Sequence, residues 1–158
     1  MSHDGVMGAD YADGRVRKPS LNFRYRVRAR LAVEAYTRRT DFGGVHKVLE
    51  LGAAEGRTLL EVRRLLGGTG TYHGVELSDA LLAAAPPLPA NVELIRGDVQ
   101  SLPDALPAGA LEPGTYTLAT ALAVLEHLPD PIACLRGAWR MLRPGGVLVA
   151  SCPHPIWD

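Results

Sequence analysis

Short apolar runs alternate with helical segments along the chain from about residue 45 onward. The runs that we predict as strands span residues 45–51, 71–76, 91–96, 115–121 and 146–151. The segments between them that we predict as helices span residues 56–67, 78–85, 101–106 and 130–142. This alternation predicts right-handed βαβ units and a doubly wound, mainly parallel α/β sheet with helices on both faces. Ligands bind to such sheets beyond the carboxyl ends of the strands, where the strand order reverses.

The length and composition fit one globular domain, because the chain has 158 residues, of which 47% are hydrophobic. The first twenty residues lack the apolar segment of a signal peptide, and no run of about 18 apolar residues could span a bilayer. We therefore expect a cytoplasmic protein with no membrane partner. Fifteen arginines against two lysines indicate a GC-rich coding genome, and we expect a bacterial source.

The charge is unevenly distributed, since residues 1–40 carry nine Lys or Arg against four Asp or Glu. Residues 1–20 show little apolar pattern and are predicted to form a flexible tail. In residues 21–40, Leu21, Tyr25 and Ala32 recur at helical spacing, which favours a helix over a strand. The arginines at positions 24, 26, 28 and 30 cannot share one helix face, so we do not expect a nucleic-acid partner. The core domain is predicted over residues 41–158.

The two cysteines, Cys134 and Cys152, are too few for a disulfide framework or a structural zinc site. We interpret both as buried or semi-buried thiols, because free cysteine commonly packs in protein cores. No redox role is predicted for them.

The stretch "VLELGAAEG", residues 48–56, joins the first predicted strand to a helix. Small residues let the backbone approach a ligand closely, and the helix amides favour an anionic group such as a phosphate or a carboxylate. The dinucleotide fingerprint G-x-G-x-x-G fails at two positions, which are Ala54 and Arg57. A phosphate loop is also excluded, because no Gly-Lys-Ser/Thr follows. The template acid-x-Gly-x-Gly-x-Gly is met by Glu50, Gly52 and Gly56, with Ala54 as the single departure.

At these residues the chain resembles the class I S-adenosylmethionine-dependent methyltransferases, and four further landmarks follow in the family's order. They are Glu76 in "YHGVELS", Asp98 in "LIRGDVQSLP", the segment "ALAVLEHLPDP" and the turn "LRPGG". Together they extend the resemblance over about residues 42–157. The family fold is a Rossmann-like sheet with strand order 3-2-1-4-5-7-6.

The resemblance implies a cofactor site for S-adenosyl-L-methionine, which becomes S-adenosyl-L-homocysteine after transfer. Glu76 would hold the ribose hydroxyls, since a carboxylate accepts two hydrogen bonds at once. Asp98, with Val99 beside it, would face the adenine amino group, and the Gly52–Gly56 loop would lie against the methionine moiety. The full set of cofactor residues implied is Glu50, Gly52, Ala53, Gly56, Glu76, Leu77, Asp98, Val99 and Ala121. We expect φ of Ala54 to be negative.

The implied activity is methyl transfer to a small-molecule acceptor, and alignment of the reactants can supply about 7 to 11 kcal/mol of the rate enhancement. A base is needed only if the acceptor arrives protonated. His127 is the preferred candidate, with Glu126 and His154 as alternatives, and Trp157 is a candidate for the acceptor pocket. We expect no metal, because no carboxylate cluster accompanies strand four. The family's usual Phe-Asp pair in that strand is replaced by Tyr116 and Thr117.

The chain ends just after the fifth predicted strand, so the family's C-terminal antiparallel hairpin has no residues to form it. We expect a fragment of a longer protein whose strand-five edge self-associates, because an open apolar edge is a template for pairing. Relatives often use an N-terminal helix as a lid, for which Tyr25 and Arg28 are candidates. Two alternative functions stay open: a cofactor-binding or interaction domain without turnover and, more distantly, an NAD(P)-dependent dehydrogenase.

Overall fold

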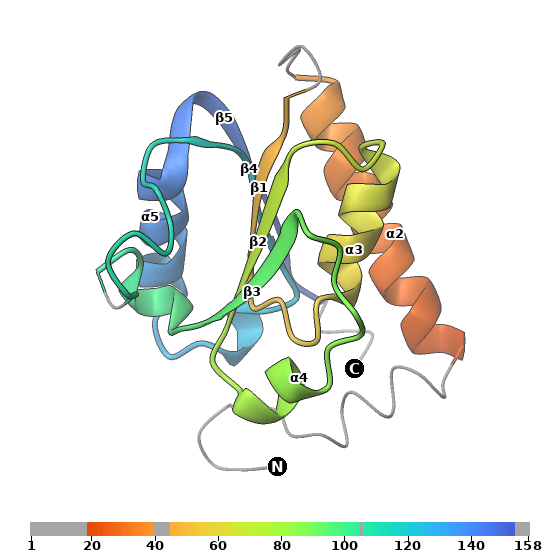
Figure 1. The fold of residues 1–158 in the computed structure, drawn as a ribbon, viewed down its shortest axis with the longest axis horizontal. Coiled ribbons are helices and arrows are strands. Elements are labelled where there is room, and N and C mark those ends of the chain that lie inside the picture. The colour runs from red at the N-terminus through yellow and green to blue at the C-terminus, as the bar shows by residue number, and fades with distance from the viewer. Residues whose placement is uncertain (1–18, 40–44, 105, 154–158) are drawn as a thin grey trace.

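The computed structural model describes residues 19–39, 45–104 and 106–153. Within this part of the chain, five strands form one sheet in the order β3-β2-β1-β4-β5, and every pairing is parallel (Figure 1). The strands are β1 (Lys47–Leu51), β2 (Thr71–Glu76), β3 (Val92–Arg96), β4 (Tyr116–Leu122) and β5 (Leu142–Ser151). The predicted doubly wound α/β class is confirmed.

Helices cover both faces of the sheet (Figure 1). They are α2 (Pro19–Thr37), α3 (Arg57–Leu65), α4 (Asp79–Ala83) and α5 (Pro131–Met141), with 3-10 turns η1 (Val99–Ser101) and η2 (Leu125–His127). The N-terminal helix is confirmed and begins earlier than predicted, at Pro19, since proline is favoured in the first helical turn. Residues 1–18, most of the predicted tail, lie outside the described residues.

The helix predicted at 101–106 is wrong. The chain forms only the single turn η1 there, and Leu102 adopts an extended ψ of 143°. The following residue, Pro103, disfavours a helical conformation of its predecessor, which explains the ending. The fifth strand also differs from its prediction, because it begins at Leu142 and not at residue 146. Its register against β4 shifts between Tyr116 and Leu118, which accommodates the turn that contains Pro144 and Gly145.

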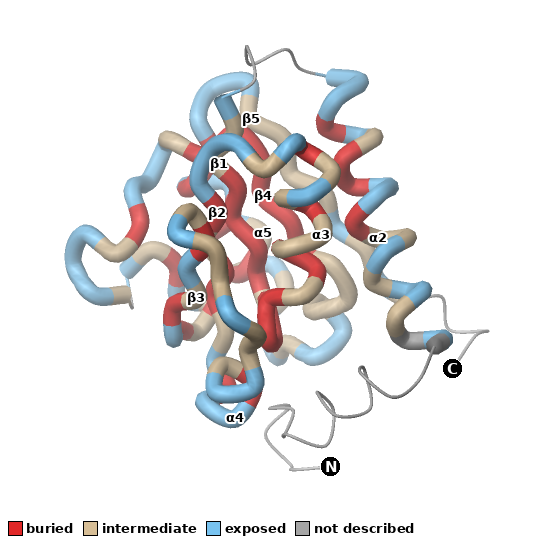
Figure 2. The backbone as a smooth tube through the Cα atoms, turned by 45° about the vertical axis from the view of Figure 1, so that its right-hand side comes forward, coloured by how far each residue is buried: buried red, intermediate tan, exposed pale blue. Residues whose placement is uncertain are grey.

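Two buried apolar layers hold the sheet between its helices (Figure 2). Successive side chains of a strand point to opposite faces. Val48 and Leu118 therefore belong to the layer beneath α2 and α3, whereas Leu49 and Ala119 belong to the layer that includes residues of α5. β4 is buried along nearly its whole length. Because the sheet is covered on both faces, ligand access is at the carboxyl ends of its strands.

Helix α2 is fixed to the amino end of the sheet by Thr117. The Tyr36 hydroxyl donates a hydrogen bond to Thr117 Oγ1 at 3.1 Å, and Tyr36 Oη also lies 3.0 Å from His46 Nδ1. Thr117 Oγ1 in turn accepts from the Lys47 amide and donates to the Lys47 carbonyl, each at 3.1 Å. Thr117 thus replaces the family's aspartate with a neutral group that joins α2, β1 and β4. The other end of α2 reaches toward the carboxyl edge of the sheet (Figure 1).

Cys134 is fully buried, and burial raises the pKa of its thiol to about 11. Cys152 is exposed, so the prediction of a buried thiol is wrong at this position. The difference follows from the fold, because Cys152 lies just beyond the last residue of the edge strand β5. Among the described helices, none is both long and apolar enough to cross a membrane.

Candidate functional site

The loop after β1 forms a tight turn against the end of β2. The amides of Gly52 and Ala53 both donate to the Val75 carbonyl, at 2.9 and 3.0 Å, and the Gly56 amide donates to the Ala53 carbonyl at 2.8 Å. Gly52 has a φ of +70°, and a Cβ atom added there would lie 2.4 Å from Val124 Cγ2. Glycine is therefore required at Gly52 both by its backbone conformation and by the close approach of the loop after β4.

Gly56 precedes the first residue of α3 and has a φ of +81°. It offers no side chain to cap the helix, so the amides of the first turn are left to other acceptors. The positive end of the helix dipole adds to their attraction for an anion. This end of α3 suits a carboxylate or a phosphate.

Ala54 has a φ of +49°, so the expectation of a negative φ is wrong. A left-handed conformation costs an alanine roughly 1–2 kcal/mol relative to the right-handed one. The Ala54 amide donates a 2.9 Å hydrogen bond to Glu76 Oε2, which is part of the compensation. The turn is strained at this residue and is held by the neighbouring strand.

Glu76 ends β2 and is half-buried. Its two carboxylate oxygens accept separate backbone hydrogen bonds, Oε2 from Ala54 and Oε1 from the Ser78 amide at 2.9 Å. An ionised carboxylate offers about four acceptor positions, so each oxygen keeps a further one. Glu76 can therefore organise the loop and accept hydrogen bonds from a ligand together. Leu77, which follows it, is exposed.

Asp98 follows β3, the neighbour of β2, and its side chain is half-buried. Its Oδ1 atom accepts hydrogen bonds from the Gln100 amide at 2.9 Å and from Gln100 Nε2 at 3.2 Å. The adjacent Val99 is buried. Because Glu76 pairs in register with Arg96, two residues before Asp98, the two carboxylates lie at the same edge of the sheet.

Two predicted cofactor residues lie within the strands of the sheet and not in the loops. Glu50 is 3% exposed within β1, where it pairs with Gly74 and Thr120. Ala121 is fully buried in the layer beneath α5. Both lie near the carboxyl ends of their strands, below the loops.

The loop after β4 carries Val124, Glu126 and His127. His127 is exposed, and its Nε2 atom lies 3.9 Å from Glu126 Oε1, which is beyond hydrogen-bonding distance. The loops after β1 and β4 meet where the strand order reverses, which is the position at which α/β sheets bind ligands. The other two acceptor-side candidates, His154 and Trp157, lie outside the described residues.

Comparison with known proteins identifies the class that this fold and site define. A family model described as a methyltransferase domain matches residues 49–148, well over half of the chain. The chain therefore belongs to this family, the class I methyltransferases, whose methyl donor is S-adenosyl-L-methionine.

Individual relatives support the assignment. A ubiquinone biosynthesis O-methyltransferase of Pseudomonas putida is 35% identical over 108 residues, covering 66% of this chain and 43% of that protein. The methyltransferase solved with the Haloferax volcanii Trm112 activator has a TM-score of 0.64 at 19% identity, covering 91% of this chain and 59% of that one. CalH, solved with SAH (S-adenosyl-L-homocysteine), has a TM-score of 0.61 at 21% identity, covering 88% and 41%. The chain spans 30% to 43% of the length of the curated relatives it matches.

Reasoning from the sequence does not predict the contacts of three residues of the site. They are Ala54, whose amide reaches Glu76, Val124, which closes over Gly52, and Gln100, which contacts Asp98. Their roles depend on contacts between loops that are distant in sequence. Only the family's preference for glycine at position 54 carried a signal.

Proposed function

We propose that this domain binds S-adenosyl-L-methionine at the carboxyl edge of β1, β2 and β3 and transfers its methyl group to a small-molecule acceptor. Glu76 would accept hydrogen bonds from the ribose hydroxyls, and Asp98 would accept one from the adenine amino group. The loop from Gly52 to Gly56 and the first turn of α3 would hold the methionine moiety. When bound, the cofactor supplies an electrophilic methyl group.

The proposal is supported most by the arrangement of Glu76. Its carboxylate is half-buried, fixed by two backbone amides and still able to accept from a vicinal diol. Leu77, the residue after Glu76, is exposed and offers apolar surface at the same strand end. Methyl transfer by alignment requires the protein chiefly to bind and orient the reactants and to exclude water.

The cofactor assignment is tested by titration calorimetry with S-adenosyl-L-homocysteine, NAD and NADP. We expect heat only with the first, and its loss in Glu76→Ala. The matched control is Glu93→Ala, because Glu93 is an exposed carboxylate on the adjacent strand β3, where it pairs in register with His73 and not with Glu76. Binding of NAD in place of S-adenosyl-L-homocysteine would support the dehydrogenase alternative and overturn this proposal.

The acceptor is proposed to present a hydroxyl nucleophile, in line with the oxygen acceptor implied by the name of the Pseudomonas putida relative. His127 would then take the hydroxyl proton, since it is exposed on the loop after β4. In an assay with a panel of small phenols, His127→Ala should lower the release of S-adenosyl-L-homocysteine and leave its affinity unchanged. Tight cofactor binding without turnover on any acceptor would favour the second candidate, a binding domain that does not catalyse.

Helix α2 is proposed to act as a lid over the cofactor, with residues 41–158 as the core that binds it. Tyr25 and Arg28 are half-buried in the half of α2 that reaches the carboxyl edge of the sheet. Removal of residues 1–40 should weaken binding of S-adenosyl-L-homocysteine. Unchanged affinity in calorimetry would contradict the lid.

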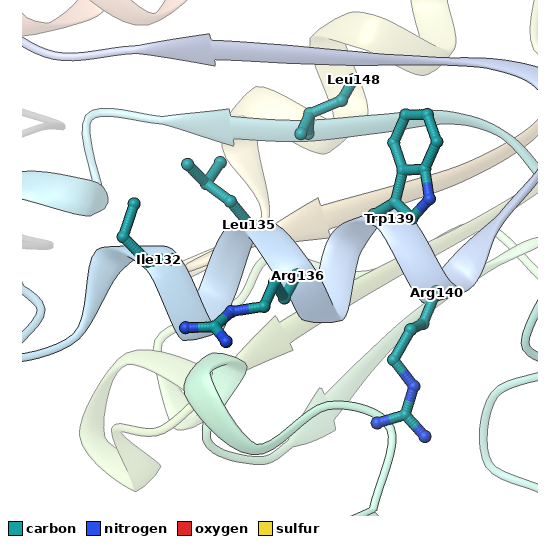
Figure 3. Close-up of a pocket in the computed structure, with 6 residues that line it drawn as sticks. All are labelled: Ile132, Leu135, Arg136, Trp139, Arg140 and Leu148. Carbon is teal, nitrogen blue, oxygen red and sulfur yellow. The ribbon is translucent and has the colours of Figure 1, made fainter.

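The proposed self-association uses β5, the edge of the described sheet, together with an open groove beside it. The groove is lined by apolar side chains of α5 and β5 and bordered by two arginines (Figure 3); its residues are Ile132, Leu135, Arg136, Trp139, Arg140 and Leu148. Trp139 is 73% exposed, an unusual environment for so large an apolar ring. A second copy paired edge to edge would cover both features. Light scattering that shows only monomer at high concentration would overturn this interface.

A further inference from the structure

Gln100 links the adenine side of the proposed site to the start of α5. Its Nε2 atom donates to Asp98 Oδ1 at 3.2 Å, and its Oε1 atom accepts from the Asp130 amide at 2.8 Å. Asp130 caps α5 by accepting a 2.9 Å hydrogen bond from the Ala133 amide. Each end of the Gln100 amide meets a group of opposite hydrogen-bonding type, so its orientation is fixed by both neighbours.

The two hydrogen bonds of the Gln100 side chain form a bridge between Asp98 and Asp130. This bridge leaves one carboxylate oxygen of Asp98 available to a ligand. Oδ1 accepts both the backbone and the side-chain hydrogen bonds of Gln100. Oδ2 accepts none from the described residues. The second side-chain torsion angle of an aspartate varies widely. The hydrogen bond from the Gln100 side chain therefore restricts a rotation of the Asp98 carboxylate that the backbone hydrogen bond alone would permit.

We infer that Gln100 is a positioning residue that aims Asp98 Oδ2 at the amino group of the cofactor's adenine. The inference rests on the proposed function, because it needs Asp98 to face adenine. Through Asp130, Gln100 also ties the adenine loop to the segment that carries His127 three residues earlier. Gln100 itself touches neither the adenine nor the acceptor in this assignment.

The property that distinguishes positioning from a general structural role is discrimination between adenine and hypoxanthine. A 6-oxo group offers an acceptor where adenine has a donor, so a fixed carboxylate should reject it. A hydrogen bond to a charged group corresponds to about a ten-fold or greater preference. Loss of a merely structural contact would weaken binding of both ligands equally.

The test measures the affinities of S-adenosyl-L-homocysteine and its inosine analogue, S-inosyl-L-homocysteine, by calorimetry. Wild type should prefer the adenine compound by about ten-fold or more, and Asp98→Asn should abolish the preference. Gln100→Met, which matches the side chain in length, should reduce the preference several-fold. Asp79→Asn is the control, since this carboxylate pairs with exposed Arg96 on the surface and should leave the preference intact.

Gln100→Glu separates the two ends of the bridge. A glutamate can still accept from the Asp130 amide, but its charge repels Asp98. It should therefore retain the thermal stability of the wild type and lose the preference for adenine, even if Gln100→Met folds poorly. An unchanged preference for adenine in Gln100→Glu would overturn this inference and leave the proposed function standing. Failure of the wild type to bind S-adenosyl-L-homocysteine would overturn both.

Discussion

The Ala54 amide donates a 2.9 Å hydrogen bond to Glu76 Oε2 and so joins the loop after β1 to the end of β2. Ala54 adopts a left-handed conformation, in which an L-residue other than glycine is strained. The same carboxylate that is proposed to bind ribose thus holds the turn beside it. Its contributions to folding and to binding can be measured separately, because the hydrogen bond exists without a ligand.

Replacement of Glu76 by glutamine should destabilise the domain itself. A glutamine has one carbonyl oxygen, so its amino group would face either the Ala54 amide or the Ser78 amide, and one charge-assisted hydrogen bond is lost. After allowance for the partial exposure of Glu76, we expect the free energy of unfolding to fall by roughly 1–2 kcal/mol in urea denaturation. Glu93→Gln should change it by less than about 0.5 kcal/mol. Equal stability of the two variants would contradict the proposed bracing role.

The strain at Ala54 predicts different outcomes for two adjacent alanine-to-glycine substitutions. Both alanines are buried, so each substitution removes one packed methyl group and adds flexibility to the unfolded chain. Only Ala54→Gly also relieves a positive φ, by roughly 1–2 kcal/mol. Ala54→Gly should therefore be more stable than Ala53→Gly by at least about 1 kcal/mol in chemical denaturation. The reverse order would show that Ala54 is not strained.

Thr117→Val should loosen the attachment of α2, since valine keeps the shape of threonine but cannot replace its hydroxyl. Tyr36 would lose one of its hydrogen bonds and keep its contact with His46, and the Lys47 amide would lose a hydrogen bond at the start of β1. The loss of these hydrogen bonds predicts a decrease of about 1–3 kcal/mol in the free energy of unfolding. Thr71→Val, at an exposed position of β2, is the matched control and should be nearly neutral. Hydrogen exchange of the α2 amides would locate the change.

Two histidines at the amino end of the sheet predict lower stability in mild acid. Burial lowers the pKa of His46 and, as the largest of several influences, that of His73. The unfolded chain therefore takes up protons at a higher pH than the folded domain, near the ordinary histidine pKa of about 6.5. The resulting stabilisation is complete above this pH and declines as the pH falls below it. Urea denaturation at several pH values should show this decline, and His73→Phe should reduce its slope; an unchanged slope would exclude His73.

Much of the fold could be predicted from the sequence, because the pattern that defines each strand is local. Strands β2 and β3 lie within one residue of their predicted bounds, since their apolar runs end at turn residues. The predicted 101–106 helix is wrong because Pro103 disfavours a helical conformation of Leu102. The predicted start of β5 is wrong because Leu142 already pairs with Tyr116 before the turn at Pro144 and Gly145. In the sequence, this turn resembles the end of a helix.

Within the candidate site, the sequence predicts the positions of single residues at strand ends, such as Glu76 and Asp98. Their positions follow from the parallel sheet, in which all carboxyl ends meet at one edge. The contacts of Ala54, Val124 and Gln100 could not be predicted, because each depends on how two loops approach in space. Ala54 is the clearest example. Its φ is positive, against the usual preference of alanine, and its amide makes a hydrogen bond with Glu76 that the sequence does not predict.

The strand order β3-β2-β1-β4-β5 places Glu76 and Asp98, which are proposed to hold the ribose and the adenine, on one side of β1 and places β4 and β5 on the other. The groove beside Trp139 and the exposed His127 belong to the second side. Under the proposed function, substitutions or grafted segments there would change the acceptor and leave the turn braced by Glu76 in place. The proposed function would in this sense be modular: one half could diverge in evolution, or be exchanged in a chimera, while the half proposed to bind the donor stays the same.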